Sequence, residues 1–127
     1  MPKNGSLTPK KKALALAEAA YDKKAENIVL LHMTKLSDFA DYFVICSADS
    51  DRGVKTIVEN IEKKCKELGS KPLGIEGLKE CRWVLIDTGD TLVHVFHGPV
   101  RAEFDIESLW NEAPRVKLPF EQEQVAS

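Results

Sequence analysis

Two short apolar runs on either side of a turn constrain the fold of this chain most strongly. Residues 83–87 and 91–97 are rich in Val, Ile and Leu, and an Asp-Thr-Gly-Asp turn separates them. This pattern predicts a β-hairpin or a pair of neighbouring strands. The Trp, His, Arg and acidic side chains in and around these runs form no spacing typical of a catalytic centre. The region therefore predicts a module that presents a binding surface, not a reaction pocket.

The rest of the chain predicts helices and strands in the order α-β-β-α-β-β-β-α. The central helix is the clearest, because apolar residues recur every three or four positions up to Gly69. Either Ser50 or Asp51 can cap its start. We expect an α/β (α+β) fold with a mixed five-stranded sheet and helices mainly on one face. The other predicted elements are a helix from Thr8-Pro9 to about Lys24, strands at 28–31, 41–46 and 73–76, and a short helical segment from Gly98-Pro99 to Trp110. The strand at 41–46 barely alternates, which favours burial on both faces.

Strand alternation assigns the side chains of the predicted hairpin to two faces. Residues 84, 86, 93 and 95 are all Val or Ile and should meet the helices. The opposite face would carry a mixed patch that is large for a monomer if it is left in water, and that has the composition of a protein interface. The alternative is that the first helix or the tail covers this face. The residues of the patch are Trp83, Leu85, Leu92, His94 and Phe96.

Composition limits the class of partner. The chain has 127 residues, which suits one domain, and its net charge of -2 with a pI of about 5.9 disfavours DNA or RNA as the primary partner. A basic protein suits it better. Residues 10–12, all Lys, are interpreted as the solvated start of a helix, with phosphate contact as the lesser alternative. The absence of a signal-like start and of a bilayer-length apolar run predicts a cytoplasmic protein without membrane contact.

Metal and catalytic sites find weak support. Three cysteines (Cys46, Cys65 and Cys81) are odd in number and are interpreted as reduced thiols. His94 and His97 lie three apart on a predicted strand and should diverge, so no metal is expected there. The main enzymatic alternative is a metal-dependent nucleotidyl transferase that uses Asp49 and Asp51, between a strand and a helix. Helix capping explains that segment more simply, because Ala48 stands where a phosphate-binding loop would need glycine.

An ordered set of motifs resembles the bacterial ribosomal silencing factors, or Iojap-like family. The resemblance covers roughly Ala13 to Ala113. It implies a small α/β domain with nucleotidyl-transferase-like topology, no known catalysis and no cofactor. It also implies that the protein binds large-subunit ribosomal protein fourteen and so sterically blocks joining of the ribosomal subunits, which represses translation under nutrient limitation. The resemblance further suggests a homodimer of the isolated protein. The motifs are residues 41–46 (DYFVIC), Ser50-x-Arg52, Pro72-x-x-x-Glu76-Gly77, Trp83-x-x-x-Asp87-x-Gly89-Asp90, residues 93–96 (VHVF), Arg101 and Leu109-Trp110.

The resemblance also carries over candidate partner-binding residues. By position, direct partner contact is assigned to Trp83 and His94. Pairing with Lys or Arg of the partner is assigned to Glu76, Asp87 and Asp90. The rim of the same surface is assigned to Arg101 and Phe104. The chain departs from the family pattern at Ser47-Ala48, which weakens any ligand role for that turn, and at His32, which is assigned no function.

Three segments are expected. Residues 1–7 are predicted to be a disordered N-terminus, residues 8–113 to be the ribosomal silencing factor domain, and residues 114–127 to be a flexible C-terminal tail. The tail lies beyond the resemblance, and deleting residues 121–127 is predicted to change neither stability nor binding.

Overall fold

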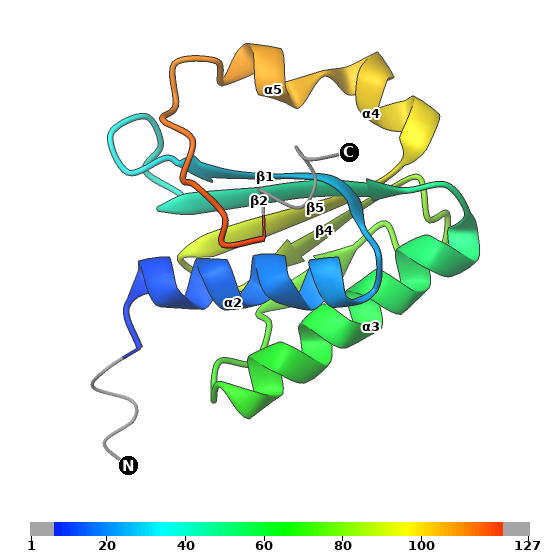
Figure 1. Cartoon of the computed structure of the whole chain (residues 1–127), viewed down its shortest axis with the longest axis horizontal. Helices are drawn as coiled ribbons and strands as arrows, with labels where there is room; N and C mark the ends of the chain where they lie inside the picture. The colour runs from blue at the N-terminus through cyan, green and yellow to red at the C-terminus, as the bar shows by residue number, and fades with distance from the viewer. Residues whose placement is uncertain (1–6, 121–127) are drawn as a thin grey trace.

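A five-stranded mixed sheet organises the part of the chain that the structure describes, residues 7–120 of this computed structural model. The predictions for residues 1–6 and 121–127 fall outside that range. The strand order is β1-β2-β5-β4-β3, and only the β2–β5 pair is parallel (Figure 1). The mixed sheet expected from the sequence is confirmed. Its strands are β1 (Glu26–His32), β2 (Tyr42–Ala48), β3 (Gly74–Glu76), β4 (Trp83–Asp87) and β5 (Thr91–His97).

Two long helices, α2 (Pro9–Asp22) and α3 (Asp51–Glu67), cover one face of the sheet (Figure 1). Both begin where the sequence predicts. Thr8 Oγ1 accepts a hydrogen bond from the Lys11 amide at 3.1 Å, and Ser50 Oγ accepts one from the Gly53 amide at 3.0 Å. The Val and Ile side chains of β4 and β5 lie in the core beneath these helices, as their alternation predicts.

Two short helices, α4 (Gly98–Phe104) and α5 (Ile106–Leu109), lie on the opposite face (Figure 1). A second apolar cluster forms beneath them, and it includes Phe43 and Phe96. The alternative in which the first helix or the tail covers this face is wrong, because α4 and α5 cover part of it. The single predicted segment is two helices because Asp105 between them adopts a left-handed conformation with φ 45°. Helices therefore cover both faces, with the long pair on one.

Lys12 is buried, which corrects the expectation that residues 10–12 form a solvated helix start. Its side chain is 6% exposed, and Nζ lies 2.8 Å from the Thr88 carbonyl oxygen and 3.0 Å from Asp90 Oδ1. The long aliphatic stem of lysine allows a charge in the first turn of α2 to reach the turn between β4 and β5. The lysine thus ties the helix to the end of the hairpin.

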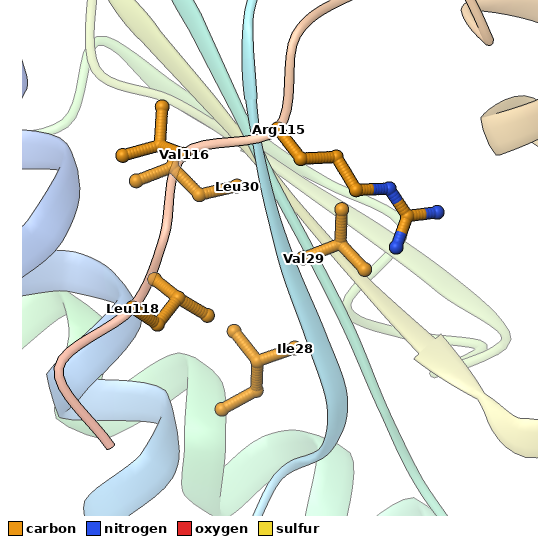
Figure 2. Close-up of a pocket in the computed structure, with 6 residues that line it drawn as sticks. All are labelled: Ile28, Val29, Leu30, Arg115, Val116 and Leu118. Carbon is orange, nitrogen blue, oxygen red and sulfur yellow. The ribbon is translucent and has the colours of Figure 1, made fainter. Parts of the chain in front are cut away.

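Residues 114–120 pack along the free edge of β1, so this part of the flexible tail expected for residues 114–127 is docked; residues 121–127 lie outside the described range. The His32 amide donates to the Pro114 carbonyl at 2.9 Å, and the Val116 amide donates to the Leu30 carbonyl at 2.8 Å. Figure 2 shows the segment crossing β1, with Leu118 beside Ile28 over a small cavity of about 20 Å³. Leu118 and Phe120 are 2% and 8% exposed. Unpaired backbone groups at a sheet edge favour such pairing, and periodicity within the tail could not reveal it.

Cys46, Cys65 and Cys81 are buried and free, as interpreted from the sequence. Burial raises the pKa of the Cys46 thiol to about 12, which makes it a poor nucleophile at neutral pH. Within residues 7–120, no helix is long and apolar enough to cross a bilayer.

The docked segment should contribute to stability. We expect truncation after Ala113 to lower the free energy of unfolding by about 3–6 kcal/mol, because it removes the buried Leu118 and Phe120 side chains. Truncation after Phe120 is the matched control and should leave the free energy unchanged. Urea unfolding followed by circular dichroism measures both. Equal stability of the two truncated chains would show that the packing of residues 114–120 contributes little.

Candidate partner-binding surface

Trp83 is the centre of the candidate surface, at the start of β4. Its indole ring stacks on Phe96 at 5.1 Å and lies 4.8 Å from the ring of Phe104 in α4. Its Nε1–H donates a hydrogen bond to His94 Nδ1 at 3.1 Å. Trp83 is half-buried, so one part of the ring belongs to the core and another part faces solvent. This combination is common for aromatic residues that anchor protein interfaces.

His94 is covered, unlike the exposed position expected from strand alternation. It is 6% exposed and lies 4.7 Å from the ring of Phe43, while Phe96 beside it is fully buried. Burial lowers the pKa of the His94 imidazole to about 4. The ring is therefore neutral at neutral pH. The cover comes from α4 and α5 and the residue that follows them: Phe104 of α4 contacts Trp83, and Trp110, directly after α5, contacts Phe43.

An open area remains beside this covered zone. We call it the Trp83 face and define it as Glu76, Trp83, Leu85, Leu92 and Phe104. Strand pairing places Glu76 opposite Leu85 on the same side of the sheet as Trp83. Glu76 and Phe104 are exposed, the latter by 51%, and the two leucines are half-buried. Apolar area around one tryptophan with an acid at its edge is what the sequence predicts for a protein interface, although the area is smaller than expected.

Arg101 lies inside the molecule, not at the rim of the surface. It is 9% exposed, and its guanidinium pairs with Glu107 through two contacts of 2.9 Å. A third contact joins Nη1 to Ser47 Oγ at 3.2 Å. The hydrogen bonds from Arg101 hold the pKa of the Glu107 carboxyl below its usual value. Arg101 thus fixes α4 and α5 to the end of β2, and the partner of this arginine was not identifiable from sequence spacing.

Asp87 and Asp90 lie at the far end of the hairpin from Trp83. Asp87 pairs with Leu92 across the strands, whereas Trp83 pairs with Phe96. Asp87 Oδ1 accepts the Gly89 amide at 2.9 Å, as turn chemistry predicts, and Asp90 pairs with the buried Lys12. The structure thus brings together Glu76, Trp83, His94 and Phe104. Asp87 shares their side of the sheet but lies at its far end, opposite Leu92, and Asp90 lies in the turn.

Asp49 and Asp51, the residues of the enzymatic alternative, are exposed at the end of β2 and the start of α3. Ser50 between them is the helix cap, and an acid in the first turn of a helix is favourable. Across residues 7–120, no three His, Cys, Asp or Glu side chains gather in a way that could hold a metal ion. Nothing in this geometry favours phosphate chemistry over capping.

Gly77 is a residue that sequence reasoning singled out only as part of a motif. Its φ is +86°, and a Cβ added there would lie 2.2 Å from the Trp83 carbonyl oxygen. Glycine therefore permits the chain between β3 and β4 to pass against the backbone of the anchoring tryptophan. The Glu76-Gly77 pair was the available signal, but the close approach depends on tertiary structure.

Comparison with known proteins identifies the family. The model of the family described as "Ribosomal silencing factor during starvation" matches residues 6–127. The chain belongs to the ribosomal silencing factor family. The match extends through the C-terminal segment, beyond the Ala113 limit of the motifs. The chain is 44% identical over 115 residues to ribosomal silencing factor RsfS of Bacillus subtilis, covering 90% of this chain and 98% of that protein.

More distant relatives and solved structures agree with this family. The chloroplastic protein Iojap of Arabidopsis thaliana is 30% identical over 114 residues, which cover 87% of this chain and 46% of that protein. A crystal structure of a Chromobacterium violaceum protein superposes with a TM-score of 0.81 at 32% identity, covering 89% of this chain and 93% of that one. A Bacillus halodurans structure gives 0.73 at 41% identity, with coverage of 82% and 94%. The chain therefore shares the fold of these two solved structures.

The close approach at Gly77 can be tested against a matched glycine. Gly69 also has a positive φ, of +72°, but an added Cβ there meets nothing within 4 Å. Gly69→Ala should cost only backbone strain of about 1 kcal/mol. Gly77→Ala should cost about 2 kcal/mol more, because the backbone of Trp83 must also move. Chemical denaturation measures both, and equal losses would contradict the proposed clash.

Proposed function

We propose that this ribosomal silencing factor acts by binding large-subunit ribosomal protein fourteen and sterically blocking association of the two ribosomal subunits under nutrient limitation. The observation that carries the proposal is the half-exposed Trp83 face in a chain of this family. A cytoplasmic location follows from this proposal. The family name describes regulation, and no cluster among residues 7–120 could hold the metal ion that the nucleotidyl-transferase alternative requires.

The make-up of the Trp83 face suits a basic protein partner. An aromatic anchor and half-buried leucines supply apolar area, and Glu76 supplies a negative charge at the edge. The net charge of -2 favours encounter with a basic protein over encounter with free nucleic acid. A second copy of this chain is the competing occupant, so a homodimer of the isolated protein is part of the proposal.

The candidate residues divide by position. We propose direct partner contact for Trp83, Glu76 and Phe104, with His94 against Trp83. Asp87 would contact only a partner that extends along the hairpin. The other two, Asp90 and Arg101, are engaged by Lys12 and by Glu107, and would act by holding the hairpin and the α4–α5 cover in place.

A subunit-joining assay tests this function. Purified protein should co-sediment with isolated large ribosomal subunits and should reduce the yield of joined ribosomes when small subunits are added. The control is the order of addition, because a steric block should act on separated subunits and not on ribosomes that are already joined. Normal joining at saturating protein would refute the proposal.

Trp83→Ala should separate binding from folding. Because the ring is only half-buried, the loss of stability should stay below the about 3–5 kcal/mol typical of a core tryptophan. Loss of the anchor should weaken binding by about 2 kcal/mol or more, which is about thirtyfold. Phe39→Ala is the matched control, since Phe39 is 85% exposed outside the Trp83 face. Calorimetry and quantitative co-sedimentation measure the two effects. A folded variant that binds like the wild type would contradict the assignment.

A further inference from the structure

The hydrogen bond between Trp83 and His94 fixes which nitrogen of the imidazole carries the proton. An indole N–H can only donate, so His94 Nδ1, 3.1 Å away, must accept and is unprotonated. A neutral imidazole carries one proton, and burial keeps this ring neutral at physiological pH. The proton therefore lies on Nε2, and that nitrogen is a hydrogen-bond donor.

This Nε2–H donor has no partner within residues 7–120. Its nitrogen is buried, and no hydrogen bond to it is formed by any described residue. Three aromatic rings lie near the imidazole, Phe43 at 4.7 Å, Trp83 at 6.0 Å and Phe96 at 6.4 Å, and its cross-strand neighbours Ile45 and Leu85 are aliphatic. Aromatic rings are at best weak acceptors. A buried donor left unpaired is unfavourable, and native structures usually satisfy such groups.

The position of this donor connects it to the proposed partner site. His94 lies opposite Leu85 of the Trp83 face, and the two side chains share one side of the sheet. Phe104 of the α4–α5 cover is 51% exposed and rests against Trp83, the hydrogen-bond partner of His94. A short helix of seven residues carries this phenylalanine, and its last residue adjoins the left-handed Asp105. Displacing an exposed aromatic ring requires less disruption than opening a fully packed core.

We propose that His94 is a specificity residue of the partner site, whose Nε2–H donates a hydrogen bond to a neutral oxygen of the bound protein once the α4–α5 cover shifts. This inference rests on the proposed function. A carbonyl, amide or hydroxyl oxygen fits better than a carboxylate, because Glu76 and Asp87 share this side of the sheet and would repel a second negative charge. A partner that lacks an acceptor would leave this buried donor unpaired, and such unpaired groups are a recognised source of binding specificity.

A matched set of three substitutions isolates the donor. The amide of glutamine reaches about as far from the backbone as Nε2, whereas that of asparagine reaches only as far as Nδ1. Asparagine can therefore still accept from Trp83, but it cannot donate to the partner, and phenylalanine keeps a ring without either function. We expect His94→Gln to bind isolated large ribosomal subunits within about threefold of wild type, and His94→Asn and His94→Phe to bind about tenfold more weakly.

The outcomes distinguish this inference from the function on which it rests. If wild-type protein fails to bind large subunits, the proposed function fails and the inference falls with it. If wild type binds and all three variants bind equally well, only the inference is overturned. Equal weakening by Gln and Asn would assign the effect to ring shape and would also overturn the donor role.

A measurement on the unmodified protein covers the case in which a variant does not fold. Nitrogen-15 NMR of the histidine side chains at pH 7 should show His94 as the Nε2–H tautomer. A proton on Nδ1 would overturn the proposal without any substitution. Thermal melts of each variant establish which binding results compare folded proteins.

Discussion

The parallel pairing of β2 with β5 is the constraint on which the rest of the structure depends. All seven residues of β2 are buried, so both faces of the sheet must be covered at its centre. The long helices α2 and α3 cover one face. The chain leaves β5 directly into α4, and α4 and α5 cover the other face over β1, β2 and part of β5 (Figure 1). These two helices do not fully cover the side of β4, and the partly open Trp83 face follows from that limited reach.

Local patterns in the sequence were sufficient for much of this architecture. The bounds of β4 and β5 match the two apolar runs, because each run alternates and a turn with Asp and Gly separates them. The central helix is capped by Ser50, one of the two residues that the sequence offered. The capping hydroxyl, the apolar spacing and the turn residues all act within a few positions of one another, which is why a single sequence reveals them.

Long-range contacts explain where prediction failed. Lys12 is identical in type to its exposed neighbours, and only the arrival of the β4–β5 turn beside α2 gives its charge a partner. The same is true of Arg101, whose partner Glu107 becomes accessible because Asp105 turns the chain between two short helices. Residues 114–120 were expected to belong to a flexible tail, yet the free edge of β1 supplies hydrogen-bond partners that the tail's own sequence does not reveal. Of the candidate site, Trp83, Glu76 and Phe104 were predictable by alternation and resemblance, whereas the burial of His94 was not.

These placements change how the seven candidate residues should be understood. Arg101 and Asp90 hold one end of the α4–α5 cover and one end of the hairpin, and the Trp83 face lies between them. Removing one member of a partly buried ion pair commonly costs more than the pair contributes, because the remaining charge is left without compensation. A loss of binding on substituting either residue would therefore follow first from displacement of the face. Residues at the face itself, by contrast, are exposed or half-buried and can change binding while the fold is retained. In this domain, burial and internal pairing thus separate the residues that shape the surface from those that a partner can contact.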